Sequence, residues 1–343
     1  MNLTKNAKPG WLYEISVIRP FLLILLVSYH AFCPFSASWQ MPVGIEANEI
    51  YKWIAYLSQA FRLEAFVFVS GYVFQMQLKK RKFEDLKSLT ISKFKRLIIP
   101  CWIFGVLYFL LLRPTDSFLP VITGIGHLWY LPTLFYCFIA SYWLFDKKLS
   151  QTKLLIAAFC LIAPSILPIP LQINRACYYL FFFLLGGAFY EWAYVIKEKS
   201  TKRKSIILWI IFSVLFIAVN LLREYNIAVL QNTPPLFYKA ILIAINAYAK
   251  AVLAVVGIAT IYVTASLYVG KHTVSKWMLD VGSLGYGVYI FHQFILKLLY
   301  YRTNIPAEVG AMWLPWIGLL VSLLLSIFLS MLLRKTSWGR TLI

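Results

Sequence analysis

The sequence predicts an all-α, polytopic integral membrane protein with about ten transmembrane helices. Hydrophobic residues make up 61% of the chain and charged residues 13%, whereas charged residues make up about 25% of an average soluble domain. The apolar residues gather into ten runs of roughly the length that crosses a bilayer. The 33 Lys and Arg side chains fall mostly in short clusters between these runs. That pattern is typical of membrane topology and argues against a nucleic-acid partner.

The ten apolar runs define the expected spans. The third is short, and the eighth is long enough to tilt or to carry an interfacial turn. No soluble domain, internal repeat or low-complexity tail is apparent, so we expect one membrane domain over 1–343. The runs cover residues 13–33, 53–77, 97–112, 127–145, 151–169, 176–196, 205–222, 239–269, 281–300 and 313–333.

Individual features support several of these spans in turn. The first run contains Arg19 and no small-residue cleavage site follows it, so we expect a retained span and not a signal peptide. In the second run, Ser70-Gly71 predicts a close helix crossing, as does Gly186-Gly187 in the sixth. The five Cys residues lie in or beside apolar runs without metal-like or redox-like spacing. We therefore expect small apolar side chains there, with no metal and no permanently bound cofactor.

The distribution of basic residues orients the chain in the membrane. With the N-terminus inside, the inside segments hold 23 Lys and Arg, the outside loops hold six, and four lie within spans. This asymmetry predicts that both termini are cytoplasmic and that the number of spans is even. The inside segments are 1–12, 78–96, 146–153, 197–204, 270–276 and 334–343.

Arg19 and His30 lie in the first run and share one face of its helix. They are eleven residues apart, a spacing that returns to within about 20° of the starting direction and rises roughly 16 Å. Ionisable groups are expensive to keep inside a bilayer, so they are functional candidates. A cation and an imidazole at two depths fit a long, thin ligand that stands upright in the protein. Alternatively, Arg19 extends to the phosphates of cytoplasmic lipids.

Other ionisable groups lie in the middle or outer half of the expected spans. Glu64 is the one carboxylate well inside a span, and it is a candidate to orient an imidazole. A protonated carboxyl or a partner for Arg62 are alternatives, although a spacing of two residues puts these two side chains on different helix faces. His127 opens the fourth span and His292 lies near the middle of the ninth. For both histidines, a hydrogen-bonded contact between helices is the structural alternative.

The segment 78–96 contains eight Lys and Arg and is the most basic part of the chain. Membrane topology alone would account for it. However, Lys93 and Arg96 are three residues apart, so on a helix they would face the same way and could clamp a phosphate. The sequence leaves both interpretations open.

Five stretches of the chain resemble, in order, acyltransferase family 3, a family of integral membrane proteins that acylate surface sugars. The stretches extend from residue 18 to 294, so the resemblance covers nearly the whole chain. The family commonly has Arg-x-x-Arg where this chain has Lys93-x-x-Arg96, and Lys lacks the bidentate fork of Arg. Glu64 stands where many members have an uncharged residue. The matching stretches are IRPFLLILLVSYHAF, FRLEAFVFVSGYVF, SKFKRLIIPCW, GHLWYLPTLF and YGVYIFHQF.

The resemblance implies an O-acyltransferase that moves an acyl group, usually acetyl, from cytoplasmic acyl-CoA to a hydroxyl of a cell-surface or exported carbohydrate. Carried over to this chain, His30 is the catalytic residue, Arg19 is its essential partner, and Lys93 and Arg96 are candidates for the CoA end. We expect a stand-alone, multi-pass protein of a bacterial cytoplasmic membrane, with acyl-CoA as co-substrate. The residue analysis agrees, because the phosphates of CoA need cations on the cytoplasmic side and the acceptor lies outside, near His30.

The mechanism expected from these residues is general-base catalysis. His30 would take the proton of the sugar hydroxyl as it attacks the thioester, or would itself carry the acyl group. Arg19 is too distant along the helix to stabilise the oxyanion, so Trp129, His127 or a backbone amide is the expected donor. We place His127, Trp129 and His292 on the substrate side of the site.

Two other functions compete with this one. A transporter or flippase for a lipid-linked sugar would also need buried charges, but it would be favoured by an inverted repeat and broken helices, and neither is apparent. A structural subunit of an envelope assembly would not explain why Arg19 and His30 share one helix face. We call this face, from Arg19 to His30, the stripe. The acyl group, the acceptor hydroxyl and the oligomeric state, a homo-oligomer included, stay open.

Overall fold

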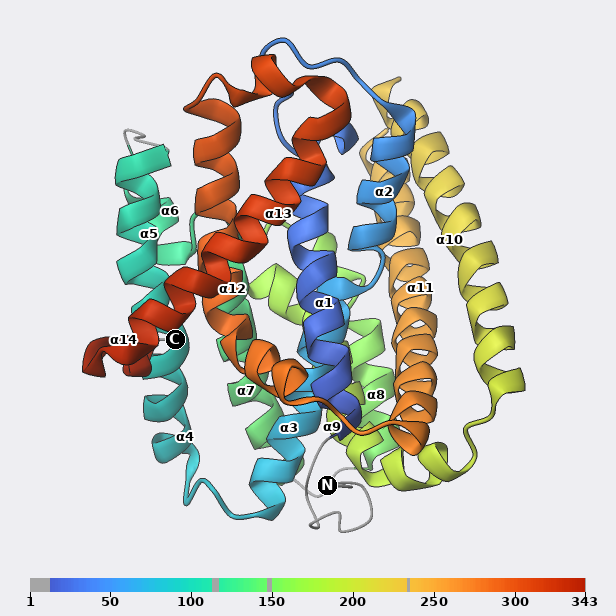
Figure 1. Cartoon of the computed structure of the whole chain (residues 1–343). Helices are drawn as coiled ribbons and strands as arrows, with labels where there is room; N and C mark the ends of the chain where they lie inside the picture. Colours follow the sequence, from blue (N-terminus) through green and yellow to red (C-terminus); the bar gives the residue numbers. More distant parts are fainter. Residues whose placement is uncertain (1–12, 113–116, 147–149, 233–234, 343) are drawn as a thin grey trace. The chain divides into compact units, whose positions relative to one another are not determined.

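The computed structural model describes residues 13–112, 117–146, 150–232 and 235–342, and its regular secondary structure is helical throughout (Figure 1). The N-terminal segment 1–12 and the basic residues Arg113, Lys147 and Lys148 lie outside the described residues. The helices are α1 (Tyr13–Phe32), η1 (Cys33–Ser36), α2 (Glu49–Gln59), α3 (Arg62–Lys79), α4 (Leu86–Lys93), η2 (Phe94–Ile98), α5 (Ile99–Leu112), α6 (Leu119–Thr123), η3 (Gly126–Trp129), α7 (Tyr130–Asp146), α8 (Gln151–Cys160), η4 (Pro164–Ile166), α9 (Ile173–Glu198), α10 (Lys202–Gln231), α11 (Leu236–Lys271), α12 (Lys276–Tyr301), α13 (Ile305–Lys335) and α14 (Ser337–Leu342).

Six helical segments in the described part of the chain are long and apolar enough to cross a membrane. They coincide with the first, third, sixth, seventh, eighth and tenth of the expected spans. The all-α class and the multi-pass character are therefore supported, whereas the count of ten and the side of the termini stay predictions. The six segments are Tyr13–Ser36, Leu86–Leu112, Ile173–Glu198, Lys202–Gln231, Leu236–Lys271 and Ile305–Lys335.

Two of the expected spans do not form single long helices in the structure. The run 53–77 is divided between α2 and α3, which break at Ala60 and Phe61. The run 151–169 forms only the ten-residue α8 and a short 3₁₀ turn. Ten helical residues rise about 15 Å, half of a hydrocarbon core. The prolines that follow α8 in the sequence PSILPIP explain why the helix ends early.

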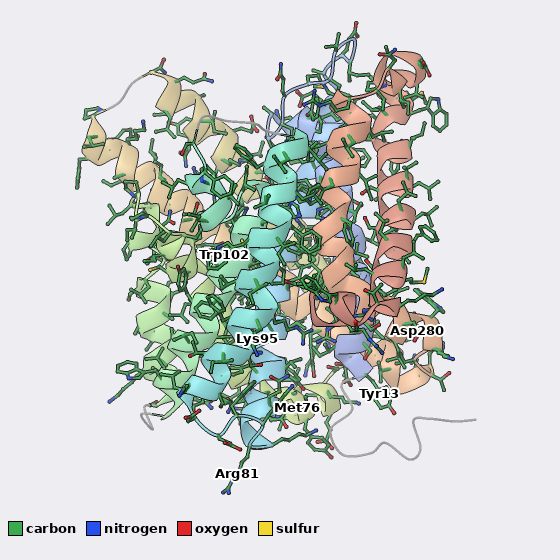
Figure 2. All side chains as sticks on the ribbon, turned by 90° about the vertical axis from the view of Figure 1, so that its left-hand side faces the viewer. Tyr13, Met76, Arg81, Lys95, Trp102 and Asp280 are labelled. Carbon is green, nitrogen blue, oxygen red and sulfur yellow. The ribbon has the colours of Figure 1, made fainter. Side chains whose placement is uncertain are left out.

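The basic segment 78–96 is mostly helical in the structure. The carboxylate of Asp85 accepts a hydrogen bond of 2.7 Å from the backbone N–H of Ser88 at the start of α4. This bond and a second from the Ser88 hydroxyl lower the pKa of Asp85. From there α4, the π-helix η2 and α5 form one continuous helix, on which Lys95 and Trp102 lie, while Arg81 points away from the turn after α3 (Figure 2).

The chain forms two compact units. Unit 1 comprises Met1–Ile18, Leu63–Lys93 and Thr133–Thr273, and unit 2 comprises Arg19–Arg62, Phe94–Pro132 and Val274–Ile343. Each unit has its own packing.

In unit 1, α3 and α9 cross at a pair of glycines. A Cβ atom on Gly186 would lie 2.0 Å from the carbonyl oxygen of Phe68, and one on Gly71 would lie 1.9 Å from that of Phe183. The two backbones therefore touch, as Ser70-Gly71 and Gly186-Gly187 predicted.

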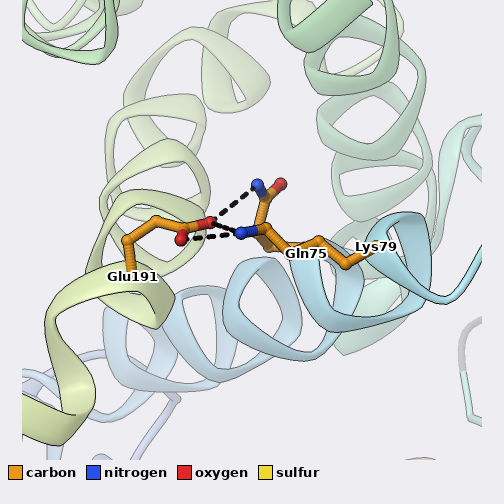
Figure 3. Close-up of polar contacts among 3 residues, drawn as sticks. All are labelled: Gln75, Lys79 and Glu191. Atoms are coloured by element: carbon orange, nitrogen blue, oxygen red, sulfur yellow. Dashed lines mark hydrogen bonds and ion pairs between the residues drawn. The ribbon is translucent and has the colours of Figure 1, made fainter.

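Other elements of unit 1 are joined by different contacts. Helices α10 and α11 run side by side (Figure 1). Glu191 of α9 forms an ion pair of 2.7 Å with Lys79 of α3 and accepts a hydrogen bond from Gln75 (Figure 3).

In unit 2, an aromatic core surrounds the end of α1. Phe32 and Tyr51 pack edge to face with ring centroids 5.3 Å apart, and both belong to one buried cluster with Tyr300 and Leu314. The hydroxyl of Tyr300 donates a hydrogen bond of 2.8 Å to the carbonyl oxygen of Ala31. This contact fixes α12 against α1 one residue away from His30.

Gly186→Ala should destabilise unit 1, because the added methyl group meets backbone atoms that cannot move aside. Overpacking of this kind costs roughly 1–3 kcal/mol. The measurement is thermal unfolding of the purified protein in detergent. Gly270→Ala is the matched control, because a Cβ there meets nothing within 4 Å. Equal unfolding temperatures for the two variants would contradict the close crossing.

A cysteine at Ser38 should react with a membrane-impermeant maleimide in intact cells, whereas one at Glu84 should react only after the membrane is opened. Both positions are exposed, and the positive-inside distribution puts them on opposite sides. A Cys160→Ser background removes the one native cysteine described as exposed. Labelling of Glu84→Cys from outside would reverse the predicted orientation.

Candidate active site

The stripe from Arg19 to His30 faces helix α12 within unit 2. A Cβ atom on Gly282 would lie 3.6 Å from the Cβ of Arg19, and one on Gly285 would lie 3.2 Å from the side chain of Leu23. Further along, His292 contacts His30. The contacts advance in the same direction on both helices, so α1 and α12 run parallel here. Arg19 and His30 therefore share one helix face, as their spacing predicted.

His30 and His292 form a buried hydrogen-bonded pair. The Nδ1 of His30 lies 2.9 Å from the carbonyl oxygen of Leu26 and 3.1 Å from the Nε2 of His292. The Nδ1 of His292 lies 3.0 Å from the carbonyl oxygen of Val288. Because carbonyl oxygens only accept, both Nδ1 atoms carry the proton, and the one Nδ1 proton of His30 is shared between the carbonyl oxygen of Leu26 and the Nε2 of His292.

This tautomer leaves the Nε2 of His30 with an unprotonated lone pair. Among the described residues, none is hydrogen-bonded to this atom. A neutral imidazole with one nitrogen held by its neighbours and the other open is the arrangement that a general base requires. The partner that orients the ring is His292, in the place where a carboxylate often stands.

His127 lies next to this pair but has both ring nitrogens occupied. Its Nδ1 lies 2.9 Å from Oε1 of Gln293, and its Nε2 lies 2.9 Å from the carbonyl oxygen of Ile290. The hydroxyl of Tyr289 donates to the backbone oxygen of His127 at 2.6 Å. The ring centroids of His127 and His292 are 5.3 Å apart. His127 therefore joins η3 to α12, and the substrate contact expected of it stays a prediction.

Two glycines shape the turn that presents His127. Gly124 and Gly126 have φ angles of 98° and 59°, which side-chain-bearing residues rarely adopt. A Cβ on Gly126 would also overlap the ring of Tyr108 at 2.6 Å. The neighbouring Trp129 packs edge to face on Tyr130, with ring centroids 6.1 Å apart. Its expected role on the substrate side stays a prediction.

Arg62 is a second cation at the histidine end of the stripe. It begins α3 at the break after α2, it is 5% exposed, and its guanidinium carbon lies 3.7 Å from the ring centroid of Tyr29. Tyr29 precedes His30, and the charge of Arg62 is near enough to act on both His30 and His292. The break between α2 and α3 thus brings a buried positive charge to the imidazole pair.

The other end of the stripe carries two arginines. Arg96 of η2 lies close enough to Arg19 for the two charges to repel each other. The hydroxyl of Tyr286 donates a hydrogen bond of 2.8 Å to the backbone oxygen of Arg96, which ties η2 to α12. Convergence of two like charges is unfavourable unless an anion lies between them. This end is therefore suited to a phosphate group.

Lys93 and Arg96 differ in their surroundings, and the phosphate clamp expected of them stays a prediction. Lys93 is buried, whereas Arg96 is exposed. The ammonium of Lys93 lies 3.8 Å from the ring centroid of Phe138 and 5.4 Å from that of Phe83, all within unit 1. A π-helix, which has a wider turn than an α-helix, begins directly after Lys93 at Phe94 and includes Arg96.

Glu64 has other partners than an imidazole in unit 1. Its carboxylate, which is fully buried, forms an ion pair of 3.0 Å with Lys250 and accepts a hydrogen bond of 3.2 Å from Tyr178. The role in orienting His30 stays a prediction, and the Nδ1 of His30 is held by Leu26 and His292 as described above. Lys250 is 186 residues away in sequence, so no local pattern indicated this pair.

The described helices and the buried histidine pair with Arg62 beside it define a multi-helix membrane protein with a candidate acid–base centre. A family model described as an acyltransferase domain matches residues 12–335. The chain belongs to this acyltransferase family, which confirms the resemblance to acyltransferase family 3. No curated protein and no solved structure matches the chain.

Three residues near His30 were not expected as site residues, namely Arg62, Trp39 and Lys297. Arg62 and Lys297 lie within expected spans, and the high cost of an intramembrane charge is the signal that would have indicated them. Trp39 lies in the segment after η1, where nothing in the sequence distinguishes it from the other aromatic residues.

Proposed function

We propose that this protein is a membrane O-acyltransferase that moves an acyl group, acetyl by preference, from acyl-CoA to a hydroxyl group of a cell-surface or exported carbohydrate. The observation that carries the proposal is the imidazole pair, in which His30 presents an unprotonated Nε2 while His292 holds its Nδ1 proton. Membership of the acyltransferase family supports the reaction type.

In the proposed reaction, the Nε2 of His30 accepts the proton of the acceptor hydroxyl as that oxygen attacks the thioester carbonyl. The tetrahedral intermediate then collapses, the carbon–sulfur bond breaks, and the proton passes from His30 to the departing CoA thiolate. The products are the acylated sugar and CoA, and His30 returns to its neutral form. Trapping of an acylated His30 without acceptor would instead favour a covalent route.

Arg62 is our candidate for stabilising the oxyanion of this intermediate. Both ring nitrogens of His127 already have partners, whereas the guanidinium of Arg62 is a buried cation beside His30. A fixed positive charge in a site that excludes water stabilises developing negative charge strongly. The donors expected from the sequence, namely Trp129, His127 or a backbone amide, stay predictions beside this one.

The arginine end is proposed to bind the phosphates of CoA. Eleven helical residues separate it from His30, or roughly 16 Å, a distance that the pantetheine arm would bridge. Acyl-CoA is made in the cytoplasm, so this end would face the cytoplasm and His30 would lie toward the outer face of a bacterial cytoplasmic membrane. The predicted topology agrees with that orientation.

The direct test is acyl transfer by the purified protein in lipid nanodiscs, with acetyl-CoA and a panel of oligosaccharides. Release of free CoA that depends on an oligosaccharide, together with a mass increase of that sugar by one acetyl group, supports the proposal. Movement of a lipid-linked sugar across vesicles without any CoA release would favour the flippase instead.

Arg19→Ala and Arg96→Ala should each raise the KM for acyl-CoA by about 10- to 100-fold, because each removes a charge-assisted contact to phosphate. Initial rates against acyl-CoA concentration measure this. Lys87→Ala is the matched control, because it removes one exposed charge from the same basic segment. Lys93→Met tests the clamp: a KM raised as in Arg96→Ala supports it, whereas lower thermal stability with a wild-type KM limits Lys93 to its contact with Phe138. An unchanged KM in Arg96→Ala would indicate that the basic segment 78–96 contributes to membrane topology and not to the binding of acyl-CoA.

A further inference from the structure

We infer that Trp39, Tyr301 and Lys297 form the acceptor subsite next to His30 and that this subsite selects a sugar carrying a negatively charged group. The inference rests on the proposed acyl transfer and adds the substrate class. All three residues belong to unit 2, as does His30.

Trp39 lies beside His30 and is partly exposed to solvent. Its ring centroid lies 5.7 Å from that of His30, and the residue is only partly buried. Aromatic faces bind apolar C–H surfaces, and one face of a pyranose ring is such a surface. A sugar that packs on Trp39 would bring a ring hydroxyl toward the imidazole.

Tyr301 and Trp39 together form an aromatic platform, and Tyr301 fixes the position of this platform. Its ring centroid lies 6.3 Å from that of Trp39, and its hydroxyl donates a hydrogen bond of 2.7 Å to the backbone oxygen of Gln40. This bond holds the segment after η1 against the end of α12. The platform is thus anchored to the helix that carries His292.

Lys297 supplies the charge that defines the ligand class. Its ammonium lies 4.5 Å from the ring centroid of Trp39 and 5.7 Å from that of Tyr301. It follows His292 by five residues on α12, or about 7.5 Å along the axis, and its charge is near enough to act on His127. Together with Arg62, which lies over the ring of the neighbouring Tyr29, Lys297 gives the acceptor end a positive potential that attracts anionic ligands.

The combination of an aromatic platform and a cation beside the base is suited to a uronic acid or another sugar with an anionic substituent. The aromatic rings would hold the ring face, and the ammonium would pair with the carboxylate. A neutral sugar would use the rings alone. We therefore expect the subsite to bind an acidic sugar more tightly than a neutral sugar that differs from it only in the carboxylate.

The experiment compares an oligosaccharide of uronic acid units with the same oligosaccharide after its carboxyl groups are reduced to alcohols. With saturating acetyl-CoA and protein in nanodiscs, the wild type should favour the acidic form by about tenfold or more in kcat/KM, as expected for one charge-assisted contact. Lys297→Met should abolish that preference by raising KM for the acidic form alone, and Lys297→Arg should restore most of it.

Trp39→Ala should raise KM for both acceptors by about tenfold, and Trp39→Phe should keep most of the affinity because it keeps an aromatic face. Lys52→Met is the control, because Lys52 also lies over a tyrosine ring in unit 2, at 5.9 Å from Tyr56, and pairs with Glu49. Equal kcat/KM for the two acceptors in the wild type, or an unchanged preference in Lys297→Met, would overturn the inference.

A binding measurement separates this inference from the proposed reaction. Isothermal titration of the acidic oligosaccharide, without acyl-CoA, should show binding that weakens about tenfold in Lys297→Met. If no acetyl transfer occurs but this binding is found, the proposed function fails and the subsite stands. If transfer to neutral sugars occurs but the acidic oligosaccharide does not bind more tightly, the subsite fails and the function stands.

Discussion

Replacement of His30 by glutamine is expected to lower the rate of acyl transfer by about 10²- to 10⁴-fold, while the protein still inserts into the membrane and still binds acyl-CoA. Glutamine keeps a polar side chain that can hydrogen-bond, but it cannot take a proton from a hydroxyl. His30→Ala should be at least as inactive. The measurement is the single-turnover rate of acetyl transfer in nanodiscs, with acyl-CoA binding followed by titration.

His272→Gln is the matched control for this experiment. His272 is exposed and follows the end of α11 in unit 1, so its replacement should leave the transfer rate unchanged. If His30→Gln transfers acetyl at the wild-type rate, both the general-base and the acyl-histidine roles are excluded. The pair with His292 would then be a structural contact between α1 and α12.

The variant Arg62→Met is expected to show the second large effect. Its kcat should fall by about 10²- to 10³-fold, as is found when one oxyanion donor is removed. The methionine keeps much of the volume of the buried side chain but removes its charge. Because the interaction forms mainly with the intermediate, KM for acyl-CoA should change little. Arg62→Lys should recover part of the rate, since a point charge lacks the planar fork of the guanidinium.

Two controls separate catalysis from stability in this variant. Arg302→Met removes an exposed arginine at the end of α12 in the same unit, so it should leave kcat unchanged. The unfolding temperature of Arg62→Met reports the lost stacking on Tyr29, a contact worth roughly 2 kcal/mol when desolvated. A variant that retains wild-type kcat would remove Arg62 from the proposed mechanism.

The features that the sequence predicted correctly depend on local periodicity. The shared face of Arg19 and His30 follows from the angle per residue of one helix, and both side chains do contact α12. The crossing at Gly71 and Gly186 follows from the small size of glycine. Helix positions also agree in most of the chain, because runs of apolar residues determine them.

The features that the sequence did not predict depend on local backbone changes or on distant partners. Nothing in the sequence indicated the π-helix that begins at Phe94 or the ring of Phe138 beside the ammonium of Lys93. Arg62 was considered only as a partner of Glu64, because nothing in the sequence showed that the helix breaks just before it. Spacing rules assume a regular α-helix, and they fail where the helix changes type or ends.

The sequence by itself determined the class of protein, the family and the stripe that joins a cation to an imidazole, because composition, charge distribution and helical periodicity are properties of one chain segment at a time. Only the tertiary structure decided what surrounds His30. Its Nδ1 is held by His292, 262 residues away, and Glu64 forms an ion pair with Lys250 on another helix. Such pairings depend on which helix faces pack together, and no spacing within a single segment encodes them.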